Sequence, residues 1–158
     1  MKKQYAATWE SVKTHSLPDW SDDYKFGIFI HWGIYSVPAY APLTWELGEV
    51  DIDEQWFCNN PYAEWYFNSI NVKQGPTYEH HIKTYGKDFA YRDFLPMWKA
   101  EKWQPTEWAN LFKRAGAKYV VLTTKHHDGF CLFPSRHTDY HCLNYGPKRD
   151  IMGELTEA

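Results

Sequence analysis

The sequence predicts an α/β fold made of two successive strand-and-helix units. Two apolar runs, residues 26–30 and 119–125, consist mainly of Ile, Val, Leu and aromatic residues, as in parallel strands buried on both faces. A helical pattern separates them, and each run is followed by histidine, at His31 and at His126–His127. Functional side chains of α/β proteins follow the carboxyl ends of parallel strands, so these histidines are expected to meet in one polar pocket.

The segment after the first strand is expected to begin as a long loop over residues 33–60, because no hydrophobic period is sustained there. Loops of this length inside a compact domain usually carry function. Pro61 predicts a helix over residues 62–67, since the fixed φ of proline suits a first helical turn. Gly75–Pro76 is expected to end this helical region.

Residues 89–103 are aromatic and irregular, with a short helix at most, and Trp98 and Trp103 are expected in the core. A clearer helix begins at Pro105 and should end at Gly116, a residue that suits the C′ position. An apolar stripe at positions i, i+3, i+4 and i+7 predicts its buried face: Trp108, Leu111, Phe112 and Ala115.

The last segments complete the two units. A polar loop that contains proline should follow the second strand, and residues 147–158 look helical. Two parallel strands do not make a stable sheet by themselves, so the chain is expected to be the beginning of something larger.

Composition narrows the classes of function. The chain has 158 residues, 44% of them hydrophobic, and a net charge of −3 without a basic block, which predicts no nucleic-acid partner. No apolar stretch is long enough for a membrane span, and the first residues do not resemble a signal peptide, so a soluble cytoplasmic protein is expected. The three cysteines lack C-x-x-C spacing, which indicates no zinc knuckle and no redox pair. Aromatic residues make up 19% of the chain, and their faces suit core packing and the apolar faces of sugars.

Several motifs in order make the chain similar to the α-L-fucosidases of glycoside hydrolase family 29. The resemblance spans nearly the whole chain, from Trp9 to Ala158. The segments that carry it are the first strand with its histidine, Lys25–Pro38; the following helix, Asn60–Tyr66; the second strand, Ala115–Phe130; and the entry to the next helix, Gly146–Asp150.

The resemblance implies a (β/α)8 TIM barrel of which this chain supplies about the first two β/α units. Residues 1–158 would then be the N-terminal portion of a glycoside hydrolase catalytic domain, and the bound partner a fucosylated glycan or a small α-L-fucoside. It also implies that the enzyme releases terminal α-L-fucose with retention of configuration, without a cofactor or a metal. The residues implied to contact fucose are His31, Tyr62, Glu64, Trp65, His126 and His127.

The catalytic residues require a separate argument, because retaining hydrolysis needs two carboxyl groups about 5–5.5 Å apart. By resemblance, the nucleophilic aspartate lies on a later strand outside this truncated chain, so the catalytic pair is unknown. By the same resemblance, Glu64 is the candidate for proton transfer within this chain. The alternative function is a non-catalytic fucose-binding or remnant protein, which self-associates through exposed strand edges as a homo-oligomer.

Each candidate also has a structural alternative. His31 would plug a strand end, one of the adjacent pair His126–His127 would point away from the pocket, and Glu64 would be a solvated first-turn carboxylate. Asp128 is expected to hold the histidines or the loop turn before Gly129.

Two further interpretations concern histidines. A zinc or iron site made by the three candidate histidines and the neighbouring aspartate is the chemical rival of a sugar site. The pairs His80–His81 and His137–His141 are expected to be surface or loop residues.

Overall fold

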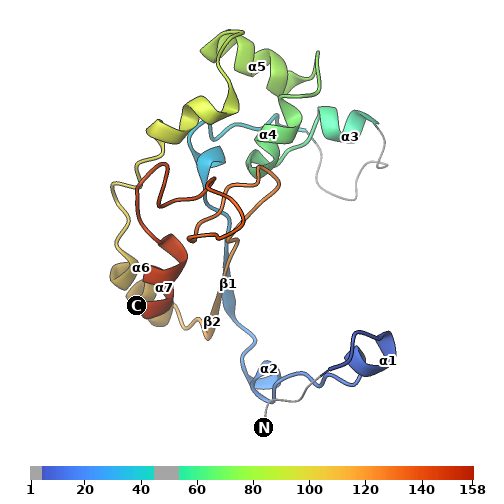
Figure 1. Ribbon diagram of the computed structural model, residues 1–158, viewed down its shortest axis with the longest axis vertical. Coiled ribbons are helices and arrows are strands. Elements are labelled where there is room, and N and C mark those ends of the chain that lie inside the picture. Colours follow the sequence, from blue (N-terminus) through green and yellow to red (C-terminus); the bar gives the residue numbers. More distant parts are fainter. Residues whose placement is uncertain (1–4, 45–53) are drawn as a thin grey trace.

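The computed structural model describes residues 5–44 and 54–158. A two-stranded parallel sheet, made of β1 and β2, lies in the middle of the molecule (Figure 1). The elements, with η for 3₁₀ helices, are α1 (Trp9–Val12), α2 (Trp20–Asp23), β1 (Gly27–Ile30), η1 (Ile34–Ser36), α3 (Glu54–Cys58), η2 (Ala63–Trp65), α4 (Tyr66–Ser69), α5 (Pro76–Tyr85), η3 (Tyr91–Met97), α6 (Pro105–Arg114), β2 (Tyr119–Leu122) and α7 (Ile151–Glu157). The predicted α/β class is therefore confirmed. The α1–α2 arm extends away from the other helices.

The two strands pair in the register that the site requires. Gly27 lies opposite Tyr119 and Ile30 opposite Leu122, and the ladder continues with the Thr123 N–H donating to the Ile30 carbonyl at 3.0 Å. Both strands thus end at the same edge of the sheet, although each is shorter than its apolar run. A Cβ at Gly27 would lie 2.2 Å from the ring of Tyr119, so a larger residue there would displace that 40% exposed ring.

The strands are more exposed than their apolar sequence predicts. Phe29 is 65% exposed and Val121 43% exposed, so the expectation of burial on both faces is wrong. The reason is that α6 and α7 lie beside the sheet and no further strand of the described residues pairs with either edge (Figure 1). Self-association through these edges stays a prediction.

The helix that begins at Pro105 is confirmed as α6, and Gly116 follows it with φ +86°, which a side chain would strain. The predicted stripe is less buried than expected, however. Leu111 is 53% exposed, and no residue of α6 is fully buried. The side chain of α6 that packs against the buried core is that of Trp108.

Proline marks one more helix start than expected. Gly75–Pro76 does not end a helical region, because Pro76 is the first residue of α5. Its missing N–H costs nothing in a first turn, as at Pro105. The helix predicted after Pro61 is the short pair η2 and α4, whereas the loop over 33–60 contains η1 and α3, and its residues 45–53 lie outside the described residues.

The remaining elements agree with expectation in kind. Residues 91–97 form the short helix η3 within the irregular segment, and α7 starts at Ile151 rather than at 147. Asp150 caps α7 by accepting a hydrogen bond from the Gly153 N–H. Within the described ranges, no helix has the length and apolar character needed to cross a bilayer.

The core is mainly aromatic. Phe94 is fully buried, and its ring contacts the rings of five neighbours: Tyr66, His81, Tyr85, Phe89 and Tyr91. Trp98 and Trp103 are 4% and 3% exposed, which confirms them as core residues. Their cluster includes Trp32, the residue directly after His31. The strand end is therefore anchored in the core next to the first candidate histidine.

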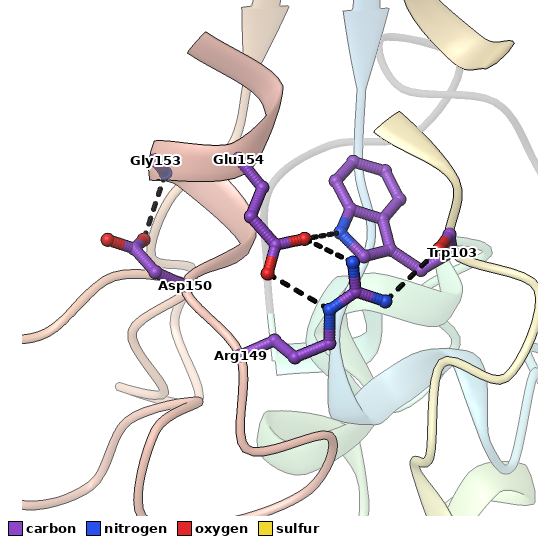
Figure 2. A network of polar contacts seen from close by, with 5 residues as sticks. All are labelled: Trp103, Arg149, Asp150, Gly153 and Glu154. Atoms are coloured by element: carbon purple, nitrogen blue, oxygen red, sulfur yellow. Dashed lines mark hydrogen bonds and ion pairs between the residues drawn. The ribbon is translucent and has the colours of Figure 1, made fainter. Parts of the chain in front are cut away.

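A polar network fastens α7 to the segment before α6 (Figure 2). The Arg149 Nε donates to Glu154 Oε1 at 2.9 Å, and the Trp103 indole N–H donates to Glu154 Oε2 at 2.9 Å. Arg149 Nη1 also donates to the Trp103 carbonyl at 3.2 Å. Because planar, two-point contacts of this kind fix geometry, the network holds the second strand-and-helix unit against the first.

We expect Glu154→Gln to lower the free energy of unfolding by about 1 kcal/mol, because the bonds of Arg149 and Trp103 lose their charged acceptor. Urea unfolding measures the change. The matched control is Asp22→Asn, which removes the carboxylate of an ion pair whose side chains are 71% and 93% exposed and should change stability by less than about 0.3 kcal/mol. Equal losses in both variants would contradict a structural role for the network.

Candidate functional site

The histidines that follow the two strands meet. The ring centroids of His31 and His126 are 5.6 Å apart, in an edge-to-face arrangement of 74°. The parallel register brings them together, because Ile30 and Leu122 end the two strands side by side. The expected convergence of the two strand ends on one place is confirmed.

Trp65 closes one side of this cluster. Its ring lies 4.0 Å from that of His127, tilted by 34°, and 6.1 Å from that of His126. Trp65 is the last residue of η2, and it is backed by the rings of Trp56 and Phe57 at 5.5 Å and 6.1 Å. The short helix after Pro61 therefore places an indole against the loop that follows β2.

The adjacent pair His126–His127 does not alternate as neighbours on a strand do. β2 ends at Leu122, and a turn closed by the Gly129 N–H on the His126 carbonyl at 3.0 Å follows. Both imidazoles consequently lie against Trp65, with their own centroids 4.8 Å apart. The alternative in which one ring points away from the site is wrong, because it assumed strand geometry.

The electrostatics of the cluster favour a neutral His126. Burial lowers the pKa of His126, and the positive charges that His127 and His31 would carry lower it further. Glu64 and Asp128 oppose this by raising the pKa. A neutral imidazole offers one donor and one acceptor nitrogen, which suits the recognition of hydroxyl groups.

Asp128 is a buried residue of the turn that carries His126 and His127. Its Oδ1 accepts from the Phe130 N–H at 3.1 Å, and its Oδ2 accepts from the Tyr91 hydroxyl at 2.8 Å. Asp128 is 8% exposed, and burial raises the pKa of its carboxyl. The expectation that Asp128 holds the loop turn is confirmed.

Glu64 and Tyr62 enter from the segment around η2. Glu64 is half-buried within η2, and its charge raises the pKa values of His126 and Tyr35, which places the carboxylate near the cluster. Tyr62 precedes η2, and its backbone N–H donates to Asn60 Oδ1 at 2.9 Å. The charge of Glu64 thus acts on the histidine cluster, and Tyr62 lies in the turn that leads into η2.

Sequence reasoning missed two tyrosines of the site. Tyr35 lies in η1, is 4% exposed, and has its ring centroid 5.7 Å from that of His126. Tyr91 comes from η3 and binds Asp128 across 37 residues of sequence. The position of Tyr35 four residues after His31, in one short helical turn, is a usable signal, whereas Tyr91 has none.

Two of the histidines expected at the surface or in loops are buried, at His81 and His141. His81 is 4% exposed because its Nδ1 lies 2.8 Å from the Tyr66 hydroxyl and its Nε2 2.8 Å from the Phe89 carbonyl. His141 is 7% exposed within the loop after β2. The expectation of surface or loop positions is wrong for His81, which is buried inside α5, but it holds for His141 as a loop residue and for His137, which is exposed.

The metal alternative finds no matching geometry in the part of the chain that the structure describes. No group of three or more His, Cys, Asp or Glu side chains converges there in a way that could hold a metal ion. Asp128, the carboxylate of that alternative, is directed to Tyr91 and Phe130 instead.

Comparison with known proteins identifies the family of this chain. The family model for α-L-fucosidases matches residues 1–158. The chain belongs to the α-L-fucosidase family. An α-L-fucosidase of Dictyostelium discoideum is 40% identical over 99% of this chain and 31% of its own length, and the human tissue α-L-fucosidase is 39% identical over 99% and 29%.

Solved structures of the α-L-fucosidase family extend this comparison to the fold. The Thermotoga maritima α-fucosidase in complex with fucose is 54% identical with a TM-score of 0.86, over 98% of this chain and 34% of that one. A fucosynthase variant from the same organism is 56% identical with a TM-score of 0.89. The chain thus spans about a third of the length of the family members that it matches.

Proposed function

We propose that residues 1–158 are the N-terminal portion of a glycoside hydrolase catalytic domain and form the first two β/α units of a (β/α)8 barrel. The parallel pair β1–β2, with helices between and after the strands, supports this arrangement. Polar side chains at the carboxyl ends of both strands support it as well, because barrel enzymes place their sites there.

The histidine cluster is, in this proposal, the part of the sugar site that reads a terminal α-L-fucose. His31, His126 and His127 supply donors and acceptors for ring hydroxyls, and Trp65 supplies apolar surface for the C6 methyl side. Tyr62 and Glu64 complete the set from the segment around η2. The single observation that carries the proposal is the 5.6 Å approach of His31 to His126, since it joins both strand ends in one site.

The proposed reaction of the whole enzyme is hydrolysis of α-L-fucosides with retention. A carboxylate attacks the anomeric carbon, an acid protonates the leaving oxygen, and water then releases fucose from the fucosyl-enzyme. Glu64 is the candidate for proton transfer in this chain. The Thermotoga maritima enzyme, 54% identical over the matched third, was crystallised with fucose and with a mechanism-based inhibitor, which supports a fucoside as substrate.

Binding of fucose without turnover is the second candidate function. It is favoured by the state of Glu64 and Asp128, the two carboxylates whose charges act on His126. Asp128 is buried and both of its oxygens accept hydrogen bonds, which leaves Glu64 as the carboxylate free to act. Retaining chemistry requires two, so this chain alone is better equipped to bind fucose than to cleave a fucoside.

The test is a titration of the chain with L-fucose, followed by NMR shifts of the labelled protein. Trp65→Ala is expected to weaken binding at least tenfold, about 1.4 kcal/mol, because the sugar loses its apolar wall. Trp9→Ala is the matched control, since Trp9 is 75% exposed in the α1–α2 arm, and it should bind fucose as the original chain does.

The outcomes separate the candidates. Absence of fucose binding in the unaltered chain would overturn the proposal. Hydrolysis of an aryl α-L-fucoside that survives repurification and is lost in Glu64→Gln would establish an enzyme, whereas binding with no turnover would establish the second candidate.

A further inference from the structure

Two buried polar atoms beside the histidine cluster lack a hydrogen-bond partner within the described residues: the Tyr35 hydroxyl and Nδ1 of His126. Each exposes less than 1 Å² to solvent. Buried polar groups are almost always paired, because an unpaired one loses its bonds to water without compensation. Two such atoms in neighbouring residues of one site require an explanation.

The two atoms are complementary and their rings are already in contact. The ring of Tyr35 meets that of His126 edge to face, at 5.7 Å and 64°. A tyrosine hydroxyl donates one hydrogen bond, and a neutral imidazole has one nitrogen that accepts. Hydrogen bonds in ligand-free sites are often long or misaligned, so rotation of the side chains is the movement required to form this one.

Another acceptor for Tyr35 is less suitable. Asp128 is near enough for its charge to act on the Tyr35 hydroxyl, but its Oδ2 already accepts from Tyr91 and its Oδ1 from the Phe130 N–H. Nδ1 of His126 is buried and has no hydrogen-bond partner among the described residues, so it is the acceptor that the Tyr35 hydroxyl would satisfy.

We propose that Tyr35 is a positioning residue whose hydroxyl donates to Nδ1 of His126 and so holds His126 in the tautomer that carries its proton on Nε2. Nδ1 is inaccessible to a ligand, so Nε2 is the nitrogen that faces one. The tautomer then decides what His126 offers: an N–H donor to a sugar oxygen. Partners behind a functional histidine fix the tautomer in this way in many sites. That a sugar is the ligand rests on the proposed function.

The experiment records ¹H–¹⁵N correlations of the histidine rings in the ¹⁵N-labelled chain at neutral pH. In the unaltered chain, His126 should carry its proton on Nε2 and accept at Nδ1. Tyr35→Phe removes only the hydroxyl, and we expect the His126 signals to move toward a mixture of tautomers and L-fucose binding to weaken about tenfold. A purely structural tyrosine would alter stability without moving the tautomer.

The matched control is Tyr66→Phe, which deletes another buried hydroxyl next to a histidine. The Tyr66 hydroxyl lies 2.8 Å from Nδ1 of His81, so this variant should shift the ring nitrogens of His81 and leave those of His126 unchanged. It shows at the same time that the measurement detects a lost tyrosine–histidine bond.

Two results would overturn the proposal: a proton on Nδ1 of His126 in the unaltered chain, or unchanged His126 signals in Tyr35→Phe. The first is decisive even if that variant does not fold. A tautomer shift in Tyr35→Phe, in a chain that does not bind fucose, supports the positioning role and contradicts the proposed function, so the two failures are distinguishable.

Discussion

Phe94→Ala is expected to lower the free energy of unfolding by about 4 kcal/mol, the largest effect of any single truncation considered in this chain. Phe94 is 0% exposed and its ring contacts five other aromatic rings. Removing it deletes buried apolar surface and leaves a cavity that flat, bulky neighbours cannot fill. Urea unfolding, followed by tryptophan fluorescence and by circular dichroism, measures the loss.

The control for Phe94→Ala comes from the same short helix. Met97 also lies in η3 but is 49% exposed, so Met97→Ala should cost less than about 1 kcal/mol. A loss below about 1.5 kcal/mol for Phe94→Ala would mean that the aromatic core is loosely packed.

Asp128→Ala is expected to have the second-largest effect, a loss of about 3 kcal/mol, because it removes both hydrogen bonds that the carboxylate accepts. The Tyr91 hydroxyl would be left buried without a partner, and the turn before Phe130 would lose its side-chain acceptor. Asp128→Asn keeps an acceptor oxygen and the shape of the residue, so it should lose less than half as much. Urea unfolding of both variants measures these changes.

Removing the charge of Asp128 should also change the pKa of His126 in a defined direction. The negative charge of Asp128 raises the pKa of His126, so removing that charge should lower this pKa further below its ordinary value of 6.5. An NMR titration of His126 in Asp128→Asn measures the shift. Since the folded pKa of His126 is the lowered one, its contribution to stability is present above pH 6.5 and declines as pH falls. A raised pKa of His126 in the variant would contradict the charge argument.

Local patterns predicted the elements whose signals lie within a few residues. The apolar runs that contain β1 and β2, the proline that opens α6, and Gly116 after it are all short-range features, and each was located from them. The same rule failed at Pro76, because α4 already ends at Ser69 and the proline is instead the first residue of α5.

Burial was predicted less well, since it depends on what lies beside a residue in space. Val121 belongs to an apolar run yet is 43% exposed, and Leu111 belongs to a helical stripe yet is 53% exposed. His81, conversely, is polar but buried, because the Tyr66 hydroxyl and the Phe89 carbonyl satisfy both of its nitrogens. No periodicity records such partners.

The sequence by itself determined the α/β class, the polar residues after each strand and, through them, the resemblance to the α-L-fucosidases, because these depend on residue type and spacing along the chain. Only the tertiary structure decided how His31, His126 and Trp65 contact one another, that both adjacent imidazoles lie against Trp65, and that Tyr35 packs on His126 while Tyr91 binds Asp128. Those relations join residues as far as 95 positions apart, from His31 to His126, and arise from the strand register and from packing, which no local segment contains.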